Sequence, residues 1–184
     1  MKISEKIVEA AKNGDKESFA ILYDSVKDDL YKLALYNLGN PHDAEDAVSE
    51  TFVEAYKGIS GIRDSSSFKA WIMRILYIRC KRKISDYIKD RHCLDIDELV
   101  DLTDEKDDME SSISQKIAVI SALNQLGNDE KNIVILSVVH GYTTKEISKI
   151  MNIPHGTVSS KLYRTYGKLR KILTEKEVNH EKRG

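Results

Sequence analysis

The sequence has few cysteines and no long apolar run. Its two thiols, Cys80 and Cys93, do not have the paired spacing of a zinc site, and a metal site that uses His92 beside Cys93 is disfavoured. No stretch approaches the ~20 apolar residues that a membrane-spanning helix needs. Residues 1–19 are charged and amphipathic and do not resemble a signal peptide. We therefore expect a soluble protein of the reducing cytoplasm.

Signatures of catalysis are also missing from the sequence. There is no glycine-rich phosphate loop, no nucleophile and base at a spacing that supports catalysis, and no metal-binding motif. We expect no enzymatic activity, no cofactor and no small-molecule substrate.

Charge is distributed unevenly along the chain, although the formal net charge is only −1. Residues 69–91 hold eight lysines and arginines against two acids, whereas residues 95–110 hold nine acids against one lysine. A uniformly acidic globule would not show this alternation. It predicts separate surfaces for nucleic acid with an acidic connector between them.

The C-terminal part predicts a helix-turn-helix. Thr143 and Glu146 have the spacing of a capping box, so a helix should begin near Thr144. Asn152 tolerates a left-handed backbone, and Pro154 favours the first turn of the next helix. Upstream of this motif, residues 133–139 are strongly apolar and are expected to form a core helix.

The last helix has two distinct faces. A period of 3.6 residues places Val158, Leu162, Leu169 and Ile172 on one side. The opposite side carries a hydroxyl, a phenol and a row of cations: Ser160, Tyr163, Arg164, Lys168 and Lys171. A solvated helix back is the alternative, but the capped helix and short turn upstream favour binding in the DNA major groove.

The N-terminal part predicts a helical bundle. Helices are expected over residues 3–13, 15–38 (with a break or bend), 42–58 and 67–88, with a glycine- and serine-rich loop at 58–67. The third helix carries a stripe of four carboxylates, Asp43, Asp46, Glu50 and Glu54. They form either a solvated face or a docking surface for a basic partner, and a metal site is less well supported.

The fourth helix interleaves aromatic and basic side chains beside the loop. Aromatics can stack on bases while cations hold the backbone, which suits single-stranded or distorted DNA. For Trp71 alone, a place in the helical core is the better interpretation.

Two parts of the chain resemble bacterial extracytoplasmic-function (ECF) sigma factors. Region 4 of that family is similar to HGYTTKEISKIMNIPHGTVSSKLYRTYGKLRK, residues 140–171. Region 2 is similar to AEDAVSETFVEAY, residues 44–56, followed by SFKAWIMRI, residues 67–75. The resemblance implies an all-α fold with region 2 at residues 1–90 and region 4 at 113–174, a flexible acidic linker at 91–112 and a polar tail at 175–184. No sign of region 3 is present.

The resemblance also implies function and partners. Such a protein binds the largest-subunit clamp of core RNA polymerase, directs initiation at promoter DNA through minus-35 and minus-10 elements, and is held by an anti-sigma factor. The implied minus-35 contacts are Thr157, Ser159, Ser160, Tyr163, Arg164, Lys168 and Lys171. The implied minus-10 contacts are Ile62, Arg63, Trp71, Arg74, Tyr77, Ile78, Lys81 and Arg82. The implied docking residues are Asp43, Asp46, Ser49, Glu50 and Glu54.

Four positions depart from the family pattern. Ser49 stands where glutamine is usual, Ile78 where asparagine is usual, Ile62 where an aromatic is common, and Ser159 where a cation is often found. These departures bear on polymerase docking and on the choice of promoter bases. A stand-alone helix-turn-helix regulator and a protein-interaction module that borrows the fold are the alternatives.

Overall fold

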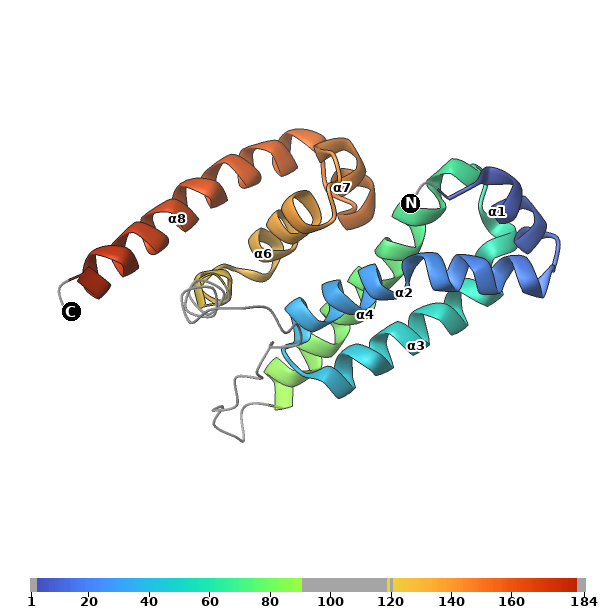
Figure 1. Cartoon of the computed structure of the whole chain (residues 1–184), viewed down its shortest axis with the longest axis horizontal. Helices are drawn as coiled ribbons and strands as arrows, with labels where there is room; N and C mark the ends of the chain where they lie inside the picture. The colour runs from blue at the N-terminus through green and yellow to red at the C-terminus, as the bar shows by residue number, and fades with distance from the viewer. Residues whose placement is uncertain (1–2, 91–118, 120, 182–184) are drawn as a thin grey trace. The chain divides into compact units, whose positions relative to one another are not determined.

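The computed structural model describes residues 3–90, 119 and 121–181, and every regular element in these ranges is helical, which confirms the all-α prediction (Figure 1). The predicted linker, with His92 and Cys93, lies outside the described residues. Two compact units are present, Met1–Val100 with Glu146–Asn152 and Asp101–Lys145 with Ile153–Gly184. None of the described helices is long and apolar enough to cross a membrane.

Four helices in residues 3–90 build the main part of the first unit, and local signals set their ends. They are α1 (Glu5–Lys12), α2 (Lys16–Leu38), α3 (Pro41–Gly58) and α4 (Phe68–Asp90). The Asp15 side chain caps α2 by accepting from the Ser18 amide, and Gly39 ends it with φ of 70°. The Asn40 side chain then caps α3, whose first residue is Pro41. Helix α2 runs without interruption from Lys16 to Leu38, so a break in it, one of the two predicted alternatives, is wrong.

The core of this unit lies among α2, α3 and α4, which pack against one another. Leu22, Leu30 and Leu33 of α2 and Ile72 and Leu76 of α4 are fully buried. Burying one such side chain contributes about 1.5–3 kcal/mol. The short α1 packs against α2 through Val8 and Ala11, near the end where α2 begins (Figure 1).

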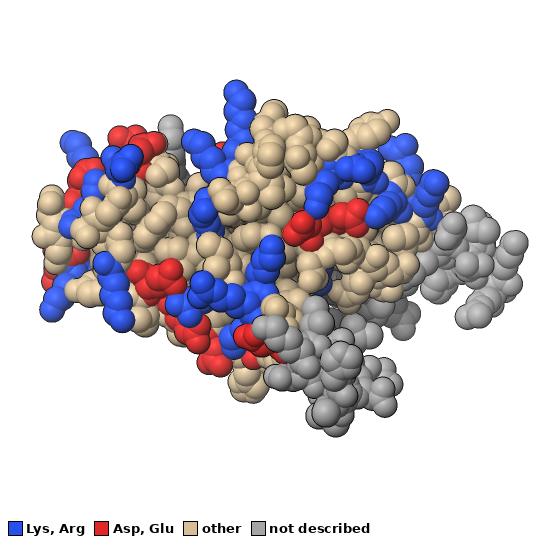
Figure 2. All heavy atoms as spheres, turned by 180° about the vertical axis from the view of Figure 1, so that it is seen from behind, with Lys and Arg blue, Asp and Glu red and all other residues tan. Residues whose placement is uncertain are grey.

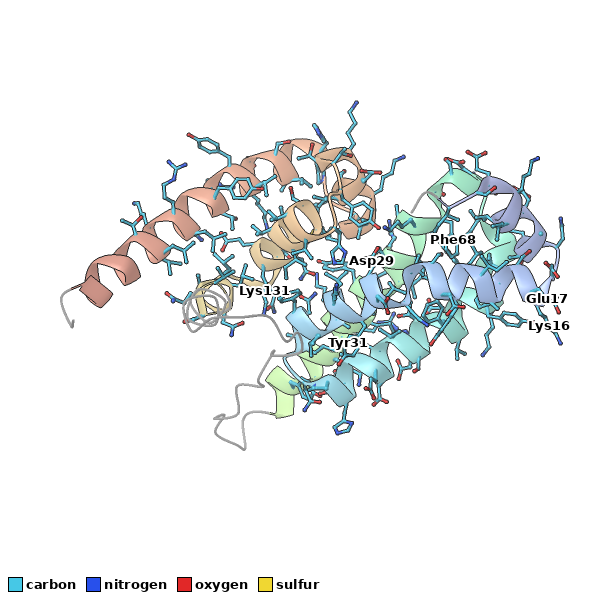
Figure 3. The ribbon with its side chains drawn as sticks, in the orientation of Figure 1. Lys16, Glu17, Asp29, Tyr31, Phe68 and Lys131 are labelled. Atoms are coloured by element: carbon cyan, nitrogen blue, oxygen red, sulfur yellow. The ribbon has the colours of Figure 1, made fainter. Side chains whose placement is uncertain are left out.

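Residues 58–67 are more ordered than a plain loop. Two 3-10 turns, η1 (Ile59–Gly61) and η2 (Ser65–Ser67), bury Ile59 and Ile62. Phe68, labelled in Figure 3, follows directly as the first residue of α4 and is fully buried. The loop is therefore held against the core at both ends.

In the second unit, α6 (Asn128–Val134) packs along α8 (His155–Glu181). Leu123, Leu126 and Val134 form a buried cluster against which Leu162 and Leu169 of α8 pack. The apolar run at 133–139 does not form one core helix as predicted. It changes at Ile135 into a π-helical turn, η3 (Ile135–Val139), that leaves Val138 63% and Val139 48% exposed.

The helix-turn-helix elements follow the predicted order. Helix α7 (Thr144–Met151) begins at the predicted residue and buries Ile147, Ile150 and Met151. Asn152, with φ of 55°, takes the left-handed conformation expected for the corner. Helix α8 runs past the predicted boundary at 174 and ends at Glu181.

Candidate nucleic-acid interface

The start of α8 is fixed by short polar contacts. The Pro154 carbonyl accepts from the amides of Thr157 at 2.9 Å and Val158 at 3.1 Å. The Thr144 hydroxyl lies 2.8 Å from Nε2 of His155, which ties the first residues of α7 and α8 together. These contacts give the first turn of α8 a defined position relative to the start of α7.

One face of α8 is buried as predicted. Val158 is fully buried, Leu162 and Leu169 are partly buried against the α6 cluster, and Ile172 is half-buried. The side chain of Thr165 is also buried on this face. Its hydroxyl donates to the Lys161 carbonyl at 2.8 Å, so no buried polar group is left without a hydrogen bond there. This seat determines which side of α8 faces outward.

The opposite face of α8 is exposed, and its side chains differ in the hydrogen bonds that they make within the helix. Tyr163 is 82% exposed, the largest value among the exposed apolar and aromatic side chains of the described residues. Arg164 is exposed while its Nε donates to the Ser160 carbonyl at 3.2 Å. The exposed Ser160 hydroxyl donates to the Thr157 carbonyl at 3.1 Å, so its oxygen can still accept a hydrogen bond. Lys171 is exposed as well.

Two lysines of α8 are held by acids of α6. Lys168 pairs with Glu130 at 2.5 Å, and Lys161 pairs with Asp129 at 2.8 Å. The hydrogen bond from Lys168 holds the pKa of the Glu130 carboxyl below its usual value. A phosphate would have to compete with Glu130 for Lys168, so Lys168 is less available than the pattern of α8 predicts. Thr157 and Ser159 are half-buried.

The residues predicted to meet minus-10 DNA fall into three groups. Arg63, Ile78, Lys81 and Arg82 are exposed, and Trp71 and Arg74 are half-buried. Trp71 packs on Phe68, with ring centroids 6.1 Å apart, and against Gly58, where an added Cβ would lie 3.4 Å from the Trp71 ring. Ile62 and Tyr77 are only 6% and 7% exposed, so in this conformation they belong to the core and offer no surface to DNA.

The carboxylates of α3 are already paired within the unit. Arg79 of α4 lies 2.6 Å from both Glu50 and Glu54, and Lys83 lies 3.2 Å from Asp43 and 3.6 Å from Asp46. The Tyr87 hydroxyl also donates to Asp43. Acid and base therefore alternate along this edge, and on the face drawn in Figure 2 blue and red side chains lie next to one another. Ser49 is exposed on α3 without taking part in these ion pairs.

The acids were predicted from the sequence, but their partners Arg79, Lys83 and Tyr87 were not. A signal was present, because these three residues recur every four positions along α4 and the acids recur every three or four along α3. The hydrogen bond to Glu54 raises the pKa of Arg79, and the charges of Glu54 and Glu50 raise it further, whereas burial acts in the opposite direction.

No group of three histidine, cysteine, aspartate or glutamate side chains within the described ranges is arranged to hold a metal ion. The candidate surfaces are separate: the exposed back of α8 in one unit, and in the other the basic edge of α4 with the folded loop and the ion-paired acidic edge of α3.

Two family models match the chain. Sigma-70 region 2 matches residues 22–92, and Sigma-70, region 4 matches residues 116–169. The first match begins within α2 and covers the rest of α2, α3, the loop and α4, and the second covers α6, α7 and α8 as far as Leu169. The helix α1 precedes both matches.

Relatives match over nearly the whole chain. The ECF RNA polymerase sigma factor SigW of Bacillus subtilis is 30% identical over 191 residues, covering 92% of this chain and 96% of its own. The ECF RNA polymerase sigma-E factor of Haemophilus influenzae is 28% identical and covers 86% of this chain and 88% of its own.

Two solved structures share the fold. CnrH, solved with the cytosolic domain of CnrY, superposes with a TM-score of 0.71 at 19% identity and covers 93% of this chain and 97% of its own. The sigma factor RpoE of Bartonella quintana, solved with the anti-sigma factor NepR, superposes with a TM-score of 0.71 at 22% identity and covers 86% and 98%.

Proposed function

The chain belongs to the ECF sigma factors, non-enzymatic proteins that direct transcription initiation, and we propose that its α8 and α3–α4 surfaces divide promoter reading and polymerase docking between them. The observation that carries the proposal is the two-sided α8. One side is seated on the α6 cluster, and the other presents Tyr163 and Arg164 to solvent.

The outer face of α8 reads the upstream, minus-35 element. Arg164 can donate to a guanine edge in the major groove, and Tyr163 and Ser160 can contact neighbouring bases. Lys171, two turns further on than Arg164, contacts a phosphate, and Lys168 does so only by leaving Glu130. Thr157 and Ser159 contribute at the N-terminal turn, where they are half-buried.

The α4 edge and the loop 58–67 bind the non-template strand of the minus-10 element. Lys81 and Arg82 hold phosphates and Arg63 lies on the loop, all three with exposed side chains. Three further contacts come from the same helix, α4: Trp71, Arg74 and Ile78. Extruding a base costs a few kcal/mol, which stacking and polymerase contacts have to offset. Ile62 and Tyr77 take part only if the structure around them changes, because both are buried.

The acidic edge of α3 docks on a basic surface of core polymerase, the clamp of its largest subunit. Asp46 is the most accessible of the four acids, with 71% of its side chain exposed. Glu50, Glu54 and Asp43 are engaged by Arg79 and Lys83, so cations of the clamp have to share or displace these partners. Ser49 offers a hydroxyl beside them.

The chain is also held inactive by an anti-sigma factor and acts in the cytoplasm, where the polymerase is found. Two relatives of the same fold were solved with such protein partners, CnrY and NepR.

Capture of core polymerase tests the proposal against a stand-alone helix-turn-helix regulator. The tagged full chain should retain purified core polymerase at low salt, and retention should fall as salt rises, because the contact is ionic. A chain that binds duplex DNA but does not retain core polymerase at any salt concentration would be a regulator of the second kind.

A further inference from the structure

A polar contact joins α1 to the loop that lies 56 residues later in the sequence. The Ser65 hydroxyl, in η2, donates to Oε1 of Glu9 on α1. Ser65 is buried and Glu9 is exposed. The Sigma-70 region 2 match begins at residue 22, so α1 lies outside the part of the chain that the family model covers.

Local hydrogen bonds give the loop its shape. The Ile62 amide donates to the Ile59 carbonyl at 3.1 Å, and Asp64 accepts from the amide of Ser66 at 3.0 Å. The Ser67 hydroxyl donates to the Asp64 carbonyl at 2.6 Å. All of these bonds connect residues two or three apart, so they set the turns without fixing them to the rest of the unit.

Packing on α1 and the hydrogen bond between Ser65 and Glu9 fix the two turns to the rest of the unit. The two turns pack on α1, and Val8, Ile59 and Ile62 are buried. Glu9 is itself oriented by Lys12, whose Nζ lies 3.0 Å from the same carboxylate oxygen. A hydrogen bond to a charged acceptor is stronger than one between neutral groups, so the carboxylate restrains Ser65 more than a neutral partner would.

We propose that Glu9 is a positioning residue for minus-10 recognition, because it holds through Ser65 the loop segment that carries Arg63. Arg63 lies two residues before Ser65 and is exposed, so a shift of Ser65 moves Arg63 with it. Glu9 does not contact DNA. The inference rests on the proposed role of the loop in reading the minus-10 element, and it extends that role to a helix that precedes the matched region.

The test uses the full chain with core polymerase on a DNA library randomised over the upstream and start-proximal elements, with transcripts counted by sequencing. Glu9→Ala should reduce the preference for the favoured start-proximal bases by about threefold to tenfold, the range that loss of one hydrogen bond produces. Preferences in the upstream element should stay unchanged, because α8 is untouched. Glu9→Gln should restore most of the preference, since its amide oxygen can accept from Ser65.

Two controls separate positioning from general destabilisation. Glu5→Ala removes the same charge from an exposed position of the same helix and should leave both preferences as in the unmodified chain. Ser65→Ala should reproduce Glu9→Ala, and the double variant should be no worse than either single variant.

Several results would overturn the inference. One is a Glu9→Ala chain that keeps its start-proximal preference and loses only total activity. Another is a Glu5→Ala chain that loses as much preference as Glu9→Ala. An unmodified chain with an upstream preference but no start-proximal preference would instead remove the proposed role of the loop itself.

Discussion

The guanidinium of Arg79 on α4 donates twice to one carboxylate oxygen of Glu54 on α3, from Nε at 3.1 Å and from Nη2 at 2.6 Å. Its Nη1 donates to Glu50 at 2.6 Å, so one arginine joins two acids that lie one helical turn apart. The surface proposed to meet polymerase is thus partly neutralised before docking. Cations of the clamp have to replace Arg79 as the partner of Glu50 and Glu54. Asp46 is the most exposed of the acids, and its ion pair with Lys83 is long, at 3.6 Å.

Charge reversal at Asp46 should weaken docking. Asp46→Lys should lower the affinity for core polymerase by about tenfold at low salt and make the remaining affinity less dependent on salt, because one ionic contact becomes a repulsion. Binding can be measured by fluorescence anisotropy of the labelled chain across a salt series. The matched control is Glu45→Lys, an exposed position on the same helix outside the acidic stripe, which should bind as the unmodified chain does. Equal losses in the two variants would contradict the assignment.

Arg164 and Lys171 should respond differently to truncation. Arg164→Ala should cost about 1–3 kcal/mol on the favoured upstream sequence and relax the preference at one base position, because it removes a base contact. Lys171→Ala should weaken all sequences alike and reduce the salt slope by about one, as expected for a phosphate contact. Binding to a panel of duplexes with single substitutions measures both. If Arg164→Ala lowers affinity without changing the order of the duplexes, Arg164 contacts phosphate, and the base-reading role passes to Tyr163 and Ser160.

The thiol of Cys80 should be inert in the folded chain. Burial raises the pKa of Cys80 to about 12 from an ordinary value of 9.0, so at pH 8 the reactive thiolate is rarer than in the unfolded chain by on the order of a thousandfold. Alkylation by iodoacetamide in a Cys93→Ser background measures Cys80 alone. The folded chain should react far more slowly than the same chain in urea. Equal rates would show that Cys80 is accessible.

The carboxyl of Glu130 should titrate below its ordinary pKa of 4.5, because Lys168 and the Gly127 amide both bind its charged form. The pair therefore stabilises the fold fully above pH 4.5, and that contribution is lost as the pH falls through the lower folded-state pKa. An NMR titration of the Glu130 side chain measures the midpoint. Lys168→Ala should raise it, whereas Lys171→Ala should not. If Lys168→Ala leaves the midpoint unchanged, the ion pair with Lys168 does not lower the Glu130 pKa.

Local chemistry made much of the fold predictable. The second predicted helix ends at residue 38, as α2 does, the third was predicted to begin at 42, one residue after α3 begins, and the apolar period of Val158, Leu162 and Leu169 predicted the buried face of α8. Each of these signals acts within one or two helical turns, so the sequence contains it directly.

Features that depend on distant neighbours were less predictable. The π-helical turn at η3 exposes Val138 and Val139, although both belong to an apolar run. Ile62 and Tyr77 stand at positions assigned to DNA by resemblance and are buried. The partners of the α3 acids lie 25 to 44 residues away, so only the packing of α3 on α4 brings them together.

Run-off transcription with purified core polymerase is the most direct test of the central claim, that this chain directs promoter-specific initiation through α8. Core polymerase with the full chain should give a discrete transcript from a promoter selected from a randomised library, and core alone should not. Tyr163→Ala combined with Arg164→Ala should abolish the preference for the selected upstream element while retaining core binding. A chain that binds core polymerase yet yields no promoter-dependent transcript, or a double variant that keeps the upstream preference, would contradict the account.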